Sequence, residues 1–152
     1  MARQDAARVK TSALLHGLFE APDLEGFMSR NAEAIQTPLF HTYISELCRT
    51  MGQVPARVIK QASIERTYGY QLFNGTRMPS RDKVIQLAFG LGLNVGDTQR
   101  LLKAAQMSLL YPRIKRDAAI LYCLNNHRDT IETQSVLETM GLTLLGGEEK
   151  HG

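Results

Sequence analysis

The sequence predicts an all-α fold, and three observations lead to this prediction. Proline and glycine stand between segments rather than inside them, and the apolar–polar alternation of β-strands is scarce. With 43% hydrophobic and 22% charged residues, the 152-residue chain can enclose a core, as one domain or as one domain with extensions. Apolar residues recur at helical spacing, most regularly at Phe40, Tyr43, Ile44, Leu47 and Cys48.

Three helices are expected in the first third of the chain. The first covers about 5–19 and ends near Ala21-Pro22, and the second covers about 24–35. Thr37-Pro38 is typical of a helix start, because threonine caps free N–H groups and proline suits the first helical position. This third helix runs to about Met51. We therefore treat residues 1–36 as an N-terminal helical extension.

Two short helices follow, at about 54–61 and 65–74, and a turn at Ala62-Ser63-Ile64 separates them. Gly75 closes the second one, where a left-handed residue commonly ends a helix. A longer helix then starts at Met78-Pro79-Ser80 and runs to about Leu91, and another covers about 95–107 behind an Asn94 cap. The five helices form a predicted domain at 37–107.

Pro112 interrupts the chain before two further helices, at about 113–125 and 130–140. Asp129 with Glu132 predicts a capping box at the start of the second. The apolar stripe of these helices exceeds what a solvated hairpin needs, so we expect the extension at 108–145 to dimerise or to pack across the domain. Residues 146–152 are expected to be a frayed tail, and no internal repeat is evident.

Positive charge is concentrated in the middle of the chain. The segment from Arg49 to Lys83 holds seven cations and two carboxylates, a net +5, whereas the remaining residues together carry −2. A polyanion such as nucleic acid would require a concentrated footprint of this kind. A basic but merely solvated helical surface would give the same pattern.

The two short helices and their turn are what a helix-turn-helix requires. In that motif one face of each helix is buried and the second helix presents its outer face to base edges. The inward positions would be Val58, Ile59, Ala62, Ile64 and Leu72. Arginine suits guanine, glutamine suits adenine and a threonine methyl suits thymine. The outward positions would be Arg66, Thr67, Tyr70, Gln71 and Asn74.

From about Phe40 to Ala105 the chain resembles the XRE (phage-repressor, lambda-repressor-like) family of helix-turn-helix regulators. The run Gln71-Leu72-Phe73-Asn74-Gly75-Thr76-Arg77-Met78-Pro79-Ser80 resembles the end of the family's recognition helix, its Gly turn and its Pro-Ser entry into helix four. The segments Leu91-Gly92-Leu93-Asn94 and Leu101-Leu102-Lys103-Ala104-Ala105 continue the family pattern in register.

The resemblance implies a five-helix lambda-repressor-like domain with additional helices at both ends. It also implies a sequence-specific transcriptional regulator of bacterial or phage type, binding double-stranded DNA as a homodimer. Together with the outward positions it nominates Arg66, Thr67, Tyr70 and Gln71 for base reading. The predicted phosphate-contacting residues are Arg57, Lys60, Asn74, Arg77 and Arg81.

Three residues depart from the family pattern. Gly69 stands on the buried side of the recognition helix where the family usually has isoleucine or valine, and Ile59 replaces a usual alanine near the helix crossing. Tyr68 or an N-terminal side chain is expected to fill the space beside Gly69. Glu65 replaces a small capping residue, and its charge would face phosphate unless it pairs with Arg66 or reads a cytosine amine.

Several other classes have no support in the sequence. No catalytic set, phosphate loop or HExxH or CxxC spacing is present, so we predict a non-enzyme without metal or cofactor. The start carries no export signal and no apolar run suits a bilayer, so a cytoplasmic, nucleoid-associated protein with reduced Cys48 and Cys123 is expected. The alternative is a protein-interaction module, antitoxin-like or an adaptor, that retains the fold with weak or no specific DNA binding.

Overall fold

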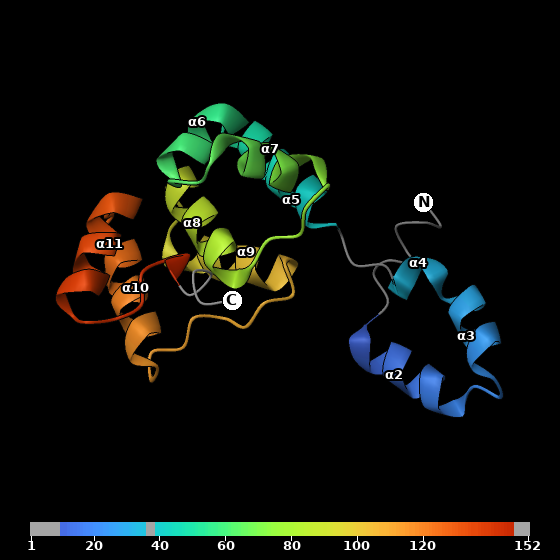
Figure 1. Cartoon of the computed structure of the whole chain (residues 1–152). Helices are drawn as coiled ribbons and strands as arrows, with labels where there is room; N and C mark the ends of the chain where they lie inside the picture. Colours follow the sequence, from blue (N-terminus) through green and yellow to red (C-terminus); the bar gives the residue numbers. More distant parts are fainter. Residues whose placement is uncertain (1–9, 36–38, 148–152) are drawn as a thin grey trace. The chain divides into compact units, whose positions relative to one another are not determined.

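The computed structural model describes residues 10–35 and 39–147. The chain divides into two compact units, with the boundary in the sequence between Thr37 and Pro38. Within the described ranges every regular element is an α-helix, labelled α2 to α11 in Figure 1, which confirms the all-α prediction. The predicted helix start at 5–9 and the predicted Thr37-Pro38 cap lie outside the described residues.

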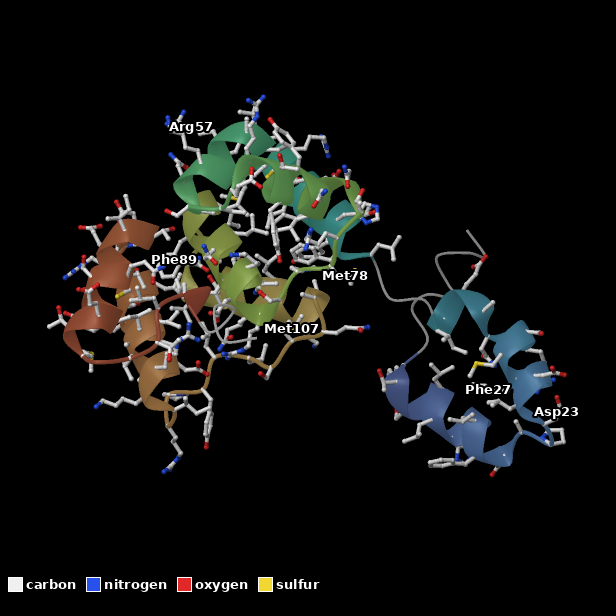
Figure 2. The ribbon with its side chains drawn as sticks, viewed as in Figure 1. Asp23, Phe27, Arg57, Met78, Phe89 and Met107 are labelled. Atoms are coloured by element: carbon white, nitrogen blue, oxygen red, sulfur yellow. The ribbon has the colours of Figure 1, made fainter. Side chains whose placement is uncertain are left out.

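The first unit contains α2 (Thr11–Glu20), α3 (Leu24–Arg30) and α4 (Ala32–Ile35). Asp23 caps α3 by accepting a hydrogen bond from the Gly26 N–H at 2.6 Å. Phe27 is buried between α2 and α3, where its ring lies against Gly17 (Figure 2). The single helix expected at 24–35 is interrupted at Asn31, whose side chain donates a hydrogen bond back to the Phe27 carbonyl.

The second unit is built around α8, which buries almost its whole length. Gly90 of α8 lets α6 approach closely, because a Cβ at this position would lie 2.5 Å from the Val58 carbonyl oxygen. Cys48 and Cys123 are buried free thiols, and burial raises the pKa of Cys48 to about 11. The helices of this unit are α5 (Phe40–Thr50), α6 (Pro55–Gln61), α7 (Arg66–Asn74), α8 (Arg81–Leu91), α9 (Val95–Ala104), α10 (Lys115–Asn125) and α11 (Thr130–Thr139).

The hairpin α8–α9 and the hairpin α10–α11 are two copies of one structural unit, shifted by 35 positions. α9 begins at Val95 and α11 at Thr130, and both have ten residues. In both units a glutamine of the second helix exchanges two hydrogen bonds with a leucine backbone eleven positions later. The equivalent pairs are Gln99 with Leu110, and Gln134 with Leu145. The expectation of no repeat is therefore wrong at the level of structure.

The two hairpins bind each other through reciprocal ion pairs. Arg81 of α8 binds Asp117 of α10 with two hydrogen bonds of 2.9 and 3.1 Å, and Arg116 of α10 binds Asp82 of α8 in the same way at 2.8 and 3.0 Å. Both carboxylates are almost fully buried. Because each hairpin supplies an arginine and an aspartate at equivalent positions, the contact resembles a two-fold interface between subunits, here formed within one chain.

The C-terminal hairpin belongs to the same compact unit as the predicted domain (Figure 1). Ile120, Leu124 and Leu137 are buried in a core shared with α8 and α9. The C-terminal extension was expected either to dimerise or to pack across the domain, and this face of the hairpin packs across the domain. The tail predicted from residue 146 also begins later, because the Gly146 N–H donates to the Asp82 carboxylate at 2.7 Å. Residues 148–152 lie outside the described residues.

Candidate nucleic-acid interface

Helices α6 and α7 are joined by a turn of four residues, 62–65, as a helix-turn-helix requires. Ser63 adopts a left-handed conformation with φ of 58°, and the Ile64 N–H then bonds back to the Ile59 carbonyl at 3.2 Å. The five residues predicted to face inward are all buried, which confirms the side of each helix that faces the core. These residues are Val58, Ile59, Ala62, Ile64 and Leu72.

Gly69 and Ile59, two of the departures from the family pattern, fit each other. A Cβ on Gly69 would lie 2.4 Å from one γ-carbon of Ile59 and 2.7 Å from the other. The isoleucine of α6 therefore fills the space that a larger residue of α7 would occupy. The expected filling by Tyr68 or an N-terminal side chain is wrong, because Ile59 occupies this space.

Glu65 caps the helix that carries the candidate base-reading residues. Its carboxylate accepts hydrogen bonds from the backbone N–H groups of Thr67 at 2.7 Å and Tyr68 at 3.1 Å. These bonds lower the pKa of Glu65 below the ordinary glutamate value, because they stabilise the ionised form. Glu65 therefore needs neither Arg66 nor a cytosine amine as its partner.

The exposed side of α7 begins with Arg66, Thr67 and Tyr70. All three side chains face solvent, with Tyr70 38% exposed. The Arg66 guanidinium lies 5.9 Å from the centre of the Tyr70 ring, within the range of a cation–π contact. Such a contact limits the positions that the arginine samples while leaving its N–H donors accessible.

Gln71 and Arg77, predicted to read bases and to contact phosphate, are bonded to each other. The Arg77 Nε–H donates to the Gln71 carboxamide oxygen at 3.0 Å, and its guanidinium lies 4.4 Å from the centre of the Tyr68 ring. Lys83 approaches the same ring at 5.2 Å. Sequence reasoning offered Tyr68 as a side chain to fill the space beside Gly69 and did not select Lys83, because only the fold brings α7 and α8 together here.

Asn74 closes the end of α7 with its own side chain. Its carboxamide oxygen accepts a hydrogen bond from the Thr76 N–H at 2.8 Å, which leaves the amide group exposed. Gly75 follows with φ of +85°, and a Cβ there would lie 2.7 Å from the His41 ring. His41 therefore packs against the turn.

The guanidinium of Arg81, a predicted phosphate contact, is bound to partners within the chain. Besides Asp117, its guanidinium donates to the carbonyl groups of Ser108 at 2.9 Å and Leu109 at 3.0 Å. With its charge paired and its donors in use, Arg81 joins α8 to α10 and is removed from the candidate phosphate contacts. By contrast, Arg57, which Figure 2 labels, and Lys60 are exposed on α6. Neither makes an ion pair with any residue that the structure describes.

An open groove of about 1030 Å³ runs between α6 and the turn that joins α10 to α11. Arg57 and Lys60 line it on one side, and His127 and Arg128 line it on the other. The two sides are joined at their base, where the Thr130 hydroxyl donates to the Gln61 carbonyl at 2.9 Å. Sequence reasoning missed His127 and Arg128 because they lie far along the chain from the basic segment.

Comparison with models of protein families, with curated proteins and with solved structures found no match for this chain. In the described part of the chain, no helix is long and apolar enough to cross a membrane. Over the same residues, no cluster of histidine, cysteine and carboxylate side chains is suited to a metal ion.

Proposed function

We propose that the chain is a sequence-specific regulator that binds double-stranded DNA, with α7 in the major groove as its recognition helix. The observation that supports this most directly is the α6–turn–α7 arrangement, in which a capped helix presents Arg66, Thr67 and Tyr70 to solvent. In this proposal the exposed Arg57 and Lys60 of the preceding helix would contact the backbone phosphates that flank the inserted helix.

Arg66, Thr67 and Gln71 of α7 each suit a particular contact. The fork of N–H donors on Arg66 fits the O6 and N7 acceptors of guanine, and the Thr67 methyl fits that of thymine. The Gln71 oxygen already accepts a bond from Arg77, so its amide N–H groups remain available to a purine N7. Arg77 therefore positions Gln71 in this proposal and still carries charge that would attract a phosphate.

Selection of bound duplexes from a random pool tests the proposal. The wild-type protein should enrich one motif, and Arg66→Ala should lose about 1–3 kcal/mol of binding free energy for it and relax the preference at one base pair. Arg100→Ala is the matched control, because Arg100 is an exposed arginine of α9 that is paired with Asp97. An unenriched pool with the wild-type protein would refute sequence-specific binding.

We also propose that the active form is a homodimer, since a two-fold operator presents two identical half-sites. The inner face of the C-terminal hairpin is occupied within the chain, so the residues available for a second copy are on its outer face. Tyr122 is 58% exposed and Met140 is 45% exposed there. Light scattering of the wild-type protein and of Tyr122→Ser should give the mass of a dimer and of a monomer respectively; a wild-type monomer on DNA would contradict this part.

A protein-interaction module is the second candidate, and the exposed apolar residues of the first unit favour it. Phe19 is 76% exposed on α2 and Leu24 is 59% exposed at the start of α3. Exposed apolar side chains gathered on a small unit commonly mark a partner-binding surface. Duplex binding no better than that of an unrelated basic protein, together with an unenriched pool, would favour this candidate over the first.

A further inference from the structure

We propose that the DNA footprint extends beyond the helix-turn-helix, and that Arg128 and His127 in the α10–α11 turn bind a backbone phosphate in the groove that they share with α6. This inference rests on the proposed function and adds contacts that neither the basic segment nor the family resemblance includes. Both residues line the groove opposite Arg57 and Lys60.

Several arginines of the chain are paired with carboxylates, whereas the cations that line this groove are not. Arg49, Arg81, Arg100 and Arg116 are bound to carboxylates, and Arg77 lies on Tyr68. Arg57, Lys60 and Arg128 have no carboxylate partner among the residues that the structure describes. Three uncompensated cations from two distant segments therefore meet in one open groove, where their summed field would attract a polyanion.

Asp129, the acidic residue that lines the groove, lowers the formal charge of the lining from +3 to +2 but does not reverse it. Asp129 caps α11 and accepts a hydrogen bond from the Glu132 N–H at 2.8 Å, while the Glu132 side chain bonds back to the Asp129 N–H at 2.9 Å. Both carboxylates are thus held at the start of α11, where the helix dipole stabilises them. Arg57, Lys60 and Arg128 make no ion pair with either carboxylate and remain available to a ligand in the groove.

The backbone of His127 provides an independent argument. Its φ of +56° is left-handed, and the equivalent residue of the first repeat unit is Gly92 with φ of +70°. Glycine adopts this conformation without the steric cost that a side chain carries. The chain nevertheless has histidine at this position, where the imidazole lines the groove and can donate a hydrogen bond to a phosphate oxygen.

The experiment measures the salt dependence of binding to a mixed-sequence duplex of about 20 base pairs, two helical turns. Phosphate contacts are independent of sequence, and each one adds about 0.9 to the slope of log K against log salt. Arg128→Ala should lower the slope by about 1 and weaken binding about eightfold at 0.1 M salt. Arg128→Lys should restore most of the slope, and His127→Gly should weaken binding without lowering the melting temperature.

Arg113→Ala is the matched control, because Arg113 is an exposed arginine in the loop before α10 and does not line the groove. It removes the same charge and should leave the slope unchanged. If Arg57→Ala lowers the slope relative to the wild-type protein and Arg128→Ala does not, this inference is overturned and the proposed function stands. Equal slopes for Arg128→Ala and Arg113→Ala would overturn it too, whereas a wild-type protein that does not bind the duplex would refute the proposed function itself.

Discussion

At the scale of single residues, the positions that depart from the family pattern are explained by their neighbours. Gly69 is a poor helix former, yet its missing side chain is what admits Ile59 between α6 and α7. Glu65 is a long residue at a position usually held by a short one, and its carboxylate reaches the same two N–H groups that a short cap would serve. Neither departure weakens the motif that contains it.

The contact between Gly69 and Ile59 predicts that the effect of Gly69→Ala on stability depends on residue 59, and that it is opposite in sign when Ile59 is replaced by alanine. Gly69→Ala should lower the free energy of unfolding by about 1–3 kcal/mol, because the new methyl group overlaps the Ile59 side chain. In an Ile59→Ala background the same change should raise it by up to about 1 kcal/mol, since alanine favours the helix. Urea unfolding of the four proteins measures both effects. Gly96→Ala on α9, where the nearest atom lies at 3.6 Å, is the control and should not destabilise the fold.

Glu65 predicts a pH dependence of stability. Its pKa is lowered in the folded state by the Thr67 and Tyr68 N–H groups, so ionised Glu65 stabilises the fold at pH values above its unfolded pKa. This contribution is lost as the pH falls through the lowered folded pKa. The stability difference between the wild-type protein and Glu65→Gln should therefore be largest near neutral pH and shrink in acid. A difference that stays constant down to the acid limit in urea titrations would contradict the role of Glu65, and Glu138→Gln on α11 serves as the reference.

At the scale of helices, the boundaries were predictable and the pairing of hairpins was not. The capping residues Asn94 and Asp129 mark the starts of α9 and α11 in the sequence, because a cap acts on the next few N–H groups. The repeat escaped notice since most equivalent positions share only their polarity. An Arg-Asp pair followed by a glutamine and two leucines at constant spacing was the available signal, and it occurs from Arg81 and again from Arg116.

The reciprocal ion pairs predict equal sensitivity of the two repeat units. Asp117→Asn and Asp82→Asn should each destabilise the fold by about 3–5 kcal/mol, because each leaves a partly buried arginine without its charge partner. Asp97→Asn, which breaks the exposed pair with Arg100, should change stability by less than about 1 kcal/mol. Chemical unfolding monitored by circular dichroism checks all three. A tolerated Asp117→Asn would show that the pair does not hold the hairpins together.

At the scale of the whole molecule, the expected domain borders and the packed core differ. The sequence suggested a border near residue 107, yet the core continues from α8 and α9 into α10 and α11 without a break. The border near residue 36 agrees with the division between the two compact units. A proline-containing loop interrupts hydrogen bonding in the backbone, but it does not prevent the helices on either side from burying apolar area against each other.

Two truncations distinguish these borders. A chain that ends at Pro112 should lose its cooperative unfolding transition, because Leu101, Leu102 and their neighbours would lose the cover of α10 and α11. A chain that begins at Pro38 should keep the transition of the second unit within a few degrees. Differential scanning calorimetry separates the two cases. A stable domain at 38–112 would contradict the shared core.

The sequence by itself determined the helical class, the two short helices α6 and α7 with their turn, and the inward side of each of these helices, since caps, turn residues and apolar spacing act over a few neighbouring positions. Only the tertiary structure decided which cations remain unpaired. Arg81 is paired with Asp117, 36 positions away, whereas Arg57 and Lys60 share a groove with Arg128, about 70 positions away. A side chain's electrostatic partner depends on distance in space, and that distance is set by the packing of the whole unit rather than by the local sequence.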